Sequence, residues 1–158
     1  MDQSSYKSVD REKKRQQGSF RRWLQWDGPG SAVIDYLGED IGNVREWIES
    51  NWIEGMNWEN YGQFWVVDHI VPLRFFDVFN AEDMSLCWHY KNLMPLLKKD
   101  NEKKQGNIFF SYEILTQLKD TDFFFNKLLD RISEEVSWMN SYISVYHQKY
   151  NYKKNMNL

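Results

Sequence analysis

Apolar residues recur every three or four positions in the segment that follows the first turn signal of the chain. The recurring residues are Leu37, Ile41, Val44, Ile48 and Trp52. Asp40 stands where an N-cap is expected, and Gly55 stands where a helix commonly ends. The pattern therefore predicts an amphipathic helix over residues 41 to 52, with its apolar stripe in the core.

Residues 64 to 71, with the sequence FWVVDHIV, are mostly β-branched or aromatic and end before a proline. This composition predicts a buried strand. Residues 92 to 97, NLMPLL, predict a second short strand, which Pro95 restricts to an edge or an early position. The polar segment KKDNEKK at 98 to 104 precedes Gly106 and predicts a short helix. The order strand, loop, strand, helix indicates an α+β fold.

The C-terminal part carries a second apolar periodicity, in which steps of four and three residues alternate. Its members are Phe125, Leu129, Ile132, Val136, Met139, Ile143, Tyr146 and Tyr150. Sustained over about three heptads, this seam predicts one long helix with a narrow apolar stripe. The helix either packs back onto the core or pairs with a second chain in a homodimer, and both alternatives remain open.

The chain has 158 residues, of which 42% are hydrophobic and 17% aromatic. This length and composition favour one compact domain and exclude a disordered chain. No stretch has the roughly 18 apolar residues of a membrane span, and the N-terminus lacks the apolar core of a signal peptide. We therefore expect a soluble, intracellular protein with no membrane partner. The single cysteine, Cys87, cannot form an intramolecular disulfide or supply the paired cysteines of many structural zinc sites.

The formal net charge of −3 is unfavourable for a nucleic-acid-binding protein, but the charge is unevenly distributed. Residues 1 to 22 contain seven basic and three acidic residues, a net charge of +4, which leaves −7 for the remainder. The basic residues are Lys7, Arg11, Lys13, Lys14, Arg15, Arg21 and Arg22. This N-terminal arm either contacts the phosphates of DNA or is a solvated tail.

These patterns divide the chain into three segments. A turn signal rich in Gly and Pro closes a basic arm that comprises residues 1–31. Residues 32–107 contain the first predicted helix and the two predicted strands, and residues 108–158 are expected to form a helical extension. We expect the packed fold to begin near Ala32.

Two titratable residues, Asp68 and His69, interrupt the first predicted strand. Burial of an uncompensated charge is costly, so an acidic and an imidazole side chain in an apolar strand indicate pairing or metal ligation. This dipeptide is therefore the first candidate for a functional site.

The segments WVVDHIVPL, HYKNLMPL and KKDNEKK together resemble the ββα-metal core of HNH endonucleases, over residues 64 to 106. Asn101 follows Asn92 by nine residues, a spacing that belongs to this resemblance. The upstream segment REWIESNWIEGMNWENYG is similar to the region that precedes the motif in many phage and virus HNH proteins. The resemblance implies a ββα-metal core within the α+β fold, and a metal-dependent endonuclease that hydrolyses DNA phosphodiester bonds.

The resemblance also implies roles for individual residues. His69 is the implied general base, a role that suits the ordinary imidazole pKa near 6.5. Asp68 and Asn101 are the implied ligands of one Mg²⁺, or of another divalent cation such as Mn²⁺, with water and phosphate at the remaining positions. Asn92 is implied to brace the loop and to orient the histidine. No structural zinc is expected, and Cys87 is expected to be packed in the core.

Other residues have less specific assignments. Lys104, beside Lys103, is similar to a basic residue frequent in the family, and it either contacts a phosphate or is an exposed helix lysine. His89 or its neighbour Tyr90 is expected to line the floor of the site, as the HYxNL pattern of similar proteins suggests. The DNA-binding candidates are Lys104, Lys103, Arg21, Arg22, Lys13, Lys14 and Arg15.

Two functions from different classes are compatible with the sequence. The first is a DNA endonuclease of phage or virus type, with a homing, restriction or defence role, that either nicks one strand or cuts both. The second is a catalytically silent HNH-fold protein that binds DNA or serves as a scaffold subunit. Because all the expected catalytic positions are filled, the sequence favours the enzyme. No separate DNA-reading module is recognisable after Gly106, so the sequence indicates no target site.

Overall fold

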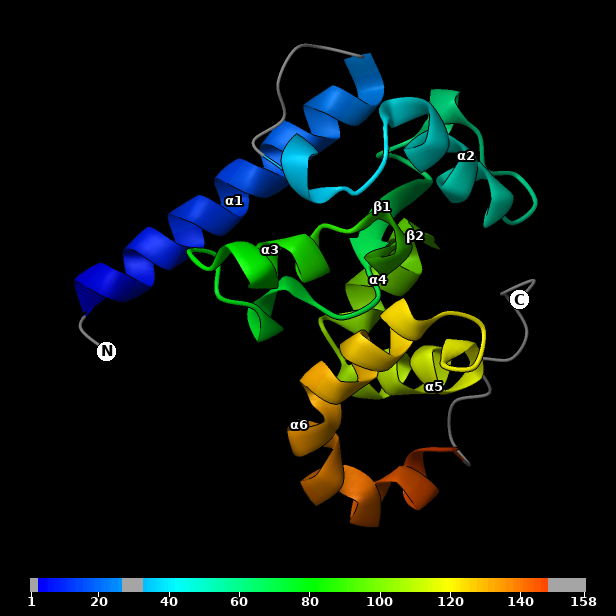
Figure 1. The fold of residues 1–158 in the computed structure, drawn as a ribbon. Coiled ribbons are helices and arrows are strands. Elements are labelled where there is room, and N and C mark those ends of the chain that lie inside the picture. The colour runs from blue at the N-terminus through cyan, green and yellow to red at the C-terminus, as the bar shows by residue number, and fades with distance from the viewer. Residues whose placement is uncertain (1–2, 27–32, 148–158) are drawn as a thin grey trace.

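The computed structural model describes residues 3–26 and 33–147, in which helices surround a two-stranded sheet (Figure 1). The helices are α1 (Gln3–Trp26), α2 (Ile41–Ser50), α3 (Ala81–Cys87), α4 (Lys98–Lys104), α5 (Ile108–Leu118) and α6 (Phe123–His147). The strands are β1 (Trp65–His69) and β2 (Leu93–Leu97). Single turns of 3₁₀ helix cover Ile34–Tyr36, Trp58–Asn60, Leu73–Phe75 and Tyr90–Asn92. The predicted α+β class is confirmed.

Strands β1 and β2 pair antiparallel, with Trp65 opposite Leu97 and His69 opposite Leu93. Helix α4 follows β2 without a loop and ends where Gln105 and Gly106 adopt the left-handed conformation, with φ of 43° and 73°. Such a reversal ends a helix because it turns the chain away from the helical path. The predicted order strand, loop, strand, helix is confirmed, with boundaries within two residues of those expected.

The helix predicted over residues 41 to 52 is confirmed but ends at Ser50. Its N-cap is the one expected, because the Asp40 carboxylate accepts a hydrogen bond from the backbone N–H of Asn43 at 2.9 Å. The indole Nε1 of Trp47 donates to the carbonyl oxygen of Leu93 at 2.8 Å. Helix α2 is thereby fixed to the beginning of strand β2.

The expectation that the packed fold begins near Ala32 is wrong, because α1 contributes to the core. Phe20, Trp23 and Leu24 are buried in the same cluster as the residues of the sheet. Full burial of a large apolar side chain stabilises a fold by about 1.5 to 3 kcal/mol, so these contacts exclude a solvated tail. The sequence did not predict this apolar face because charged residues surround it, and its buried hydrophobic members lie in the second half of the helix.

Helices α5 and α6 pack against each other at the opposite end of the molecule from α1 and α2 (Figure 1). The first half of α6 buries one stripe of side chains, namely Phe125, Leu128, Ile132 and Val136. Of the predicted seam, Phe125, Ile132 and Val136 therefore pack within the chain, whereas Leu129 is only partly buried and Leu128 takes the buried position instead. The side chains of Met139, Ile143 and Tyr146 lie outside the described part, as does Tyr150. Among residues 3–26 and 33–147, no helix has the length and apolar character to cross a membrane.

Candidate active site at the end of strand β1

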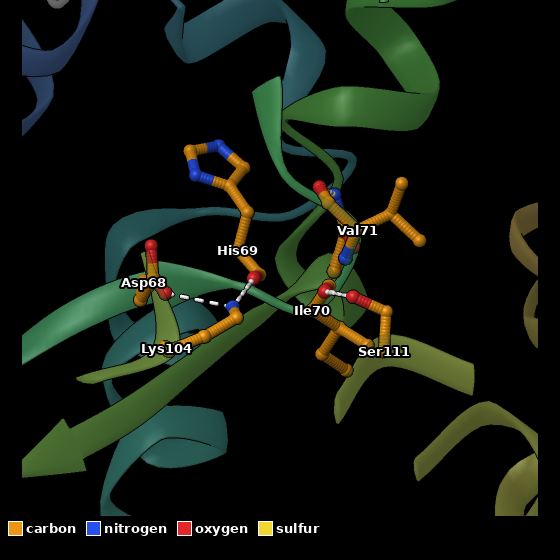
Figure 2. Close-up of polar contacts among 7 residues, drawn as sticks. Asp68, His69, Ile70, Val71, Lys104 and Ser111 are labelled. Carbon is orange, nitrogen blue, oxygen red and sulfur yellow. Dashed lines mark hydrogen bonds and ion pairs between the residues drawn. The ribbon is translucent and has the colours of Figure 1, made fainter. Parts of the chain in front are cut away.

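Asp68 and His69 are the last two residues of β1, and α4 presents Lys104 to both of them (Figure 2). The Lys104 ammonium lies 2.7 Å from Oδ2 of Asp68 and also donates to the backbone carbonyl oxygen of His69. The Lys104 side chain is only 3% exposed, whereas that of Asp68 is 26% exposed. Burial lowers the pKa of Lys104, while the charge of Asp68 acts in the opposite direction. The prediction of an exposed helix lysine is therefore wrong, because α4 packs this residue against the strand end.

The imidazole of His69 is 6% exposed, and its Nε2 is buried with no hydrogen-bond partner among the described residues. Its ring meets the Trp88 ring edge-on, with the centroids 4.6 Å apart. Burial lowers the pKa of His69 to about 4, although the Asp68 carboxylate opposes the shift; the Lys104 charge adds to it. The imidazole is therefore neutral at pH 7, and burial disfavours its protonated form as long as the ring is shielded from water in this arrangement.

Trp88 connects His69 to helix α1. Its indole Nε1 donates to Oε1 of Gln16 at 3.1 Å, and its ring lies 5.3 Å from that of Phe20. The Gln16 amide donates in turn to Glu12 at 2.9 Å. Neither Trp88 nor Gln16 was a candidate from the sequence. The only available signal was that Gln16 is a polar residue in line with the apolar face of α1.

Asn92 braces the loop that follows β1. Its side-chain Oδ1 accepts from the backbone N–H of Val71 at 2.9 Å, and its Nδ2 donates to the carbonyl oxygens of Val71 at 3.3 Å and Cys87 at 2.7 Å. Its own carbonyl oxygen accepts from the N–H of Ile70 at 2.7 Å. From the other side, the Ser111 hydroxyl donates to the carbonyl oxygen of Ile70 (Figure 2). These contacts agree with the bracing role that the resemblance implies.

The second predicted metal ligand, Asn101, comes from the helix that packs against β1. Asn101 lies on α4, one turn before Lys104, and is partly buried. Over the described ranges, no cluster of three or more His, Cys, Asp and Glu side chains is present. Asp68 and Asn101 carry a carboxylate and an amide, which are oxygen donors of the kind that a hard divalent cation prefers.

The structure does not bring His89 to this group. Its ring stacks on Tyr90 and Phe124, with centroids 4.8 and 4.1 Å away, and its Nδ1 accepts from the N–H of Lys91 at 3.3 Å. Burial lowers the pKa of His89, and the charges that act on it come from Lys91, Asp122, Glu39 and Lys127 rather than from the end of β1. His89 therefore belongs to a separate cluster at the start of α6, not to the floor of the site.

Two further residues of the sequence predictions are Lys103 and Cys87. Lys103 is at the surface, where it pairs with Asp100 at 3.6 Å. Cys87 is fully buried, and burial raises the pKa of its thiol. The prediction of a packed cysteine is confirmed.

The basic candidates of α1 lie mainly on its solvent-facing side, where acidic neighbours partly neutralise them. Lys14 pairs with Asp10 at 2.7 Å, and Arg15 pairs with Glu12 at 2.6 Å. A hydrogen bond from Arg21 acts on the Tyr61 hydroxyl, whose pKa burial raises. Of the remaining two, Arg22 is exposed and Lys13 is partly buried. This surface is part of the fold rather than a separate arm.

The chain is similar to two uncharacterized proteins of Acanthamoeba polyphaga mimivirus. It is 40% identical to protein L426 over 76 residues, which are 48% of this chain and 34% of that protein. It is 33% identical to protein L246 over 67 residues, which are 42% of this chain and 30% of that protein. The chain thus spans about a third of the length of these relatives. No protein-family model and no solved structure matches it.

Proposed function

We propose that the chain is a metal-dependent endonuclease of the HNH type, which hydrolyses phosphodiester bonds of DNA. The observation that carries the proposal is the bracing of the loop after β1 by Asn92, in a strand, loop, strand, helix order with Asp68 and His69 at the strand end. A buried asparagine that fixes the backbone beside an acid and a histidine gives the fixed geometry that hydrolysis requires.

The arrangement supports a division of roles. His69 is neutral at pH 7 and would take the proton of the attacking water. Asp68 and Asn101 would hold one divalent ion, Mg²⁺ or Mn²⁺. When bound, this ion would neutralise charge that develops on the phosphate oxygens. Asn92 keeps the loop in place and does not touch the reacting atoms.

The burial of His69 sets a condition for this chemistry. A general base must come within hydrogen-bond reach of the water that it deprotonates. Because Nε2 is buried beside Trp88, the ring must gain access to the substrate when DNA binds. The unpartnered Nε2 favours such a change, since a buried nitrogen without a partner costs about 1 to 3 kcal/mol.

The test is cleavage of supercoiled plasmid by the full chain in the presence of Mg²⁺. We expect open-circular product first, because a site with one ion acts on one strand at a time. EDTA should abolish cleavage, and His69→Ala should lower the rate by about 10²- to 10⁴-fold. Gln117→Ala changes an exposed residue of α5 and serves as the control. Cleavage that survives both EDTA and His69→Ala would disprove the proposal.

The second candidate is a catalytically silent DNA-binding or scaffold protein, which the burial of His69 specifically favours. If the chain is a silent DNA-binding protein, it should retard DNA in a gel-shift assay without cutting it at any concentration of Mg²⁺ or Mn²⁺. The plasmid assay and the gel shift, carried out on the same preparation, separate the two functions.

A further inference from the structure

The carboxylate of Asp68 already has a cationic partner within the protein. The Lys104 ammonium lies 2.7 Å from its Oδ2, and the lysine side chain is 3% exposed. Lysine is almost never buried to this extent unless its charge is paired. The ion pair is therefore a built feature of the junction between β1 and α4, not a chance surface contact.

The environment of the ammonium restricts what else Lys104 can do. Besides Asp68, it donates to the carbonyl oxygen of His69, and its nitrogen lies 4.9 Å from the centre of the Phe110 ring. Two of its three N–H groups are thus directed at strand β1. A phosphate contact would require that these bonds break and that the side chain leave a buried position.

A divalent ion bound by Asp68 would meet this ammonium at close range. The two cations would share one carboxylate, and like charges this close repel each other strongly where burial weakens screening by water. Without a lysine, in contrast, the partly buried carboxylate would be uncompensated in the metal-free protein. The same residue can therefore stabilise the metal-free fold and weaken the binding of metal.

We propose that Lys104 is an internal counter-ion of Asp68, which competes with the divalent cation and sets the affinity of the site for it. This inference rests on the proposed function in that it takes Asp68 as a metal ligand. Lys104 acts on the metal through Asp68 and is a positioning residue. The ammonium must withdraw from Asp68, or at least share it, each time the site is loaded.

The test measures binding of Mn²⁺ to the full chain by electron paramagnetic resonance, which detects the free ion and needs no DNA or activity. We compare the wild type with Lys104→Met, which keeps the length of the side chain and removes its charge. Lys99→Met is the matched control, because it removes the same charge from an exposed position of the same helix. Asp68→Asn identifies the part of the binding that depends on the carboxylate. Circular dichroism checks that each variant is folded.

We expect Lys104→Met to lower the dissociation constant for Mn²⁺ about tenfold or more, and Lys99→Met to leave it nearly unchanged. If Lys104→Met does not fold, Lys104→Gln, which keeps a hydrogen-bond donor, should show the same tightening. Equal or weaker binding in the folded Lys104 variant overturns the inference. If binding is then still lost in Asp68→Asn, the proposed metal site stands without it. If no protein binds Mn²⁺, the inference and the proposed metal site both fail.

Discussion

The side-chain amide of Asn92 forms two hydrogen bonds with the main chain of Val71: Oδ1 accepts from its N–H at 2.9 Å, and Nδ2 donates to its carbonyl oxygen at 3.3 Å. The same amide donates to the carbonyl oxygen of Cys87. Asn92 is fully buried, so no water can replace these bonds when the side chain is removed. Three of the hydrogen bonds that fix the loop after β1 therefore come from the side chain of Asn92.

Asn92→Ala should lower the free energy of unfolding by about 2 to 4 kcal/mol, because it leaves buried backbone groups without partners. Urea denaturation measures the change, with the exposed Gln117→Ala as the control for loss of a carboxamide. In the folded fraction, cleavage should fall as well, since the position of His69 depends on this loop. A loss of stability below 1 kcal/mol would mean that the loop is held mainly by other contacts.

The proposed roles of Asp68, Asn101 and His69 predict different responses to metal. Asp68→Ala and Asn101→Ala should weaken Mg²⁺ binding, so that part of their activity returns at high Mg²⁺ concentration. His69→Ala leaves both oxygen donors in place and should stay inactive at any concentration. Cleavage rates over a range of Mg²⁺ concentrations distinguish these cases. A common response of all three variants would contradict the separation of ligand from base.

Local patterns in the sequence were sufficient to predict the elements that carry the site. The β-branched and aromatic composition of β1, the polar run of α4 and the positions of Asp40 and Gly106 are signals within a few residues of the structure that they determine. The proximity of Asp68 and His69 needed no tertiary information, because the two residues are adjacent in the chain.

Contacts between distant segments were not predictable in this way. Lys104 is buried in a pair with Asp68, which lies 36 positions earlier in the chain. The sequence around Lys104, a polar helix with Lys103 beside it, does not indicate this partner. Trp88 and Gln16 are 72 positions apart, and α1 has a mostly polar sequence in which few apolar residues mark the buried face. The burial of His69 beneath Trp88 therefore results from tertiary packing, which the sequence motif does not predict.

The burial of His69 predicts a pH dependence of stability. Its pKa is lowered from 6.5 to about 4 in the folded chain, so between these values the unfolded chain binds a proton that the folded chain does not. The contribution of the neutral imidazole to the free energy of unfolding is complete above pH 6.5 and is lost as the pH falls toward 4. Between pH 7.5 and 5 it should decrease by about 2 kcal/mol.

Urea denaturation at these two pH values measures the total decrease, to which other groups also contribute. In His69→Gln, which does not titrate, the decrease should be smaller by about 2 kcal/mol. The difference between the two proteins thus isolates the histidine. Identical decreases would show that the imidazole is accessible to protons in the folded chain.

Helix α1 is part of the core, so the proposal that its basic residues contact DNA cannot be tested by deleting it. Deletion of residues 1 to 22 would remove the buried Gln16 and Phe20, so a loss of DNA binding could reflect unfolding. Lys14→Gln with Arg22→Gln instead alters two exposed residues. If both contact phosphates, the slope of log affinity against log salt concentration should decrease by up to about 1.8.

Fluorescence anisotropy of a labelled duplex over a range of salt concentrations gives this slope. The control is Lys119→Gln with Lys127→Gln, which makes the same change of charge on the segment from α5 to α6, away from α1 (Figure 1). An equal effect of the two pairs would indicate that net charge, rather than the surface of α1, governs affinity.

The packing of α6 distinguishes the two interpretations of its apolar seam for the part of the helix whose side chains are described. Ile132 is fully buried and lies in the same core cluster as Phe125, Leu128 and Val136. Ile132→Ala should therefore lower the free energy of unfolding by about 2 to 4 kcal/mol through the cavity that it creates. Ser133→Ala, at an exposed neighbouring position, should have little effect.

Protein concentration provides the decisive comparison for Ile132. A residue that packs within one chain affects the unfolding midpoint equally at all concentrations, whereas a residue that pairs two chains has an effect that depends on concentration by mass action. We expect the decrease caused by Ile132→Ala to be the same over a hundredfold range of concentration. A decrease that grows on dilution would instead assign Ile132 to contact between two copies of the chain.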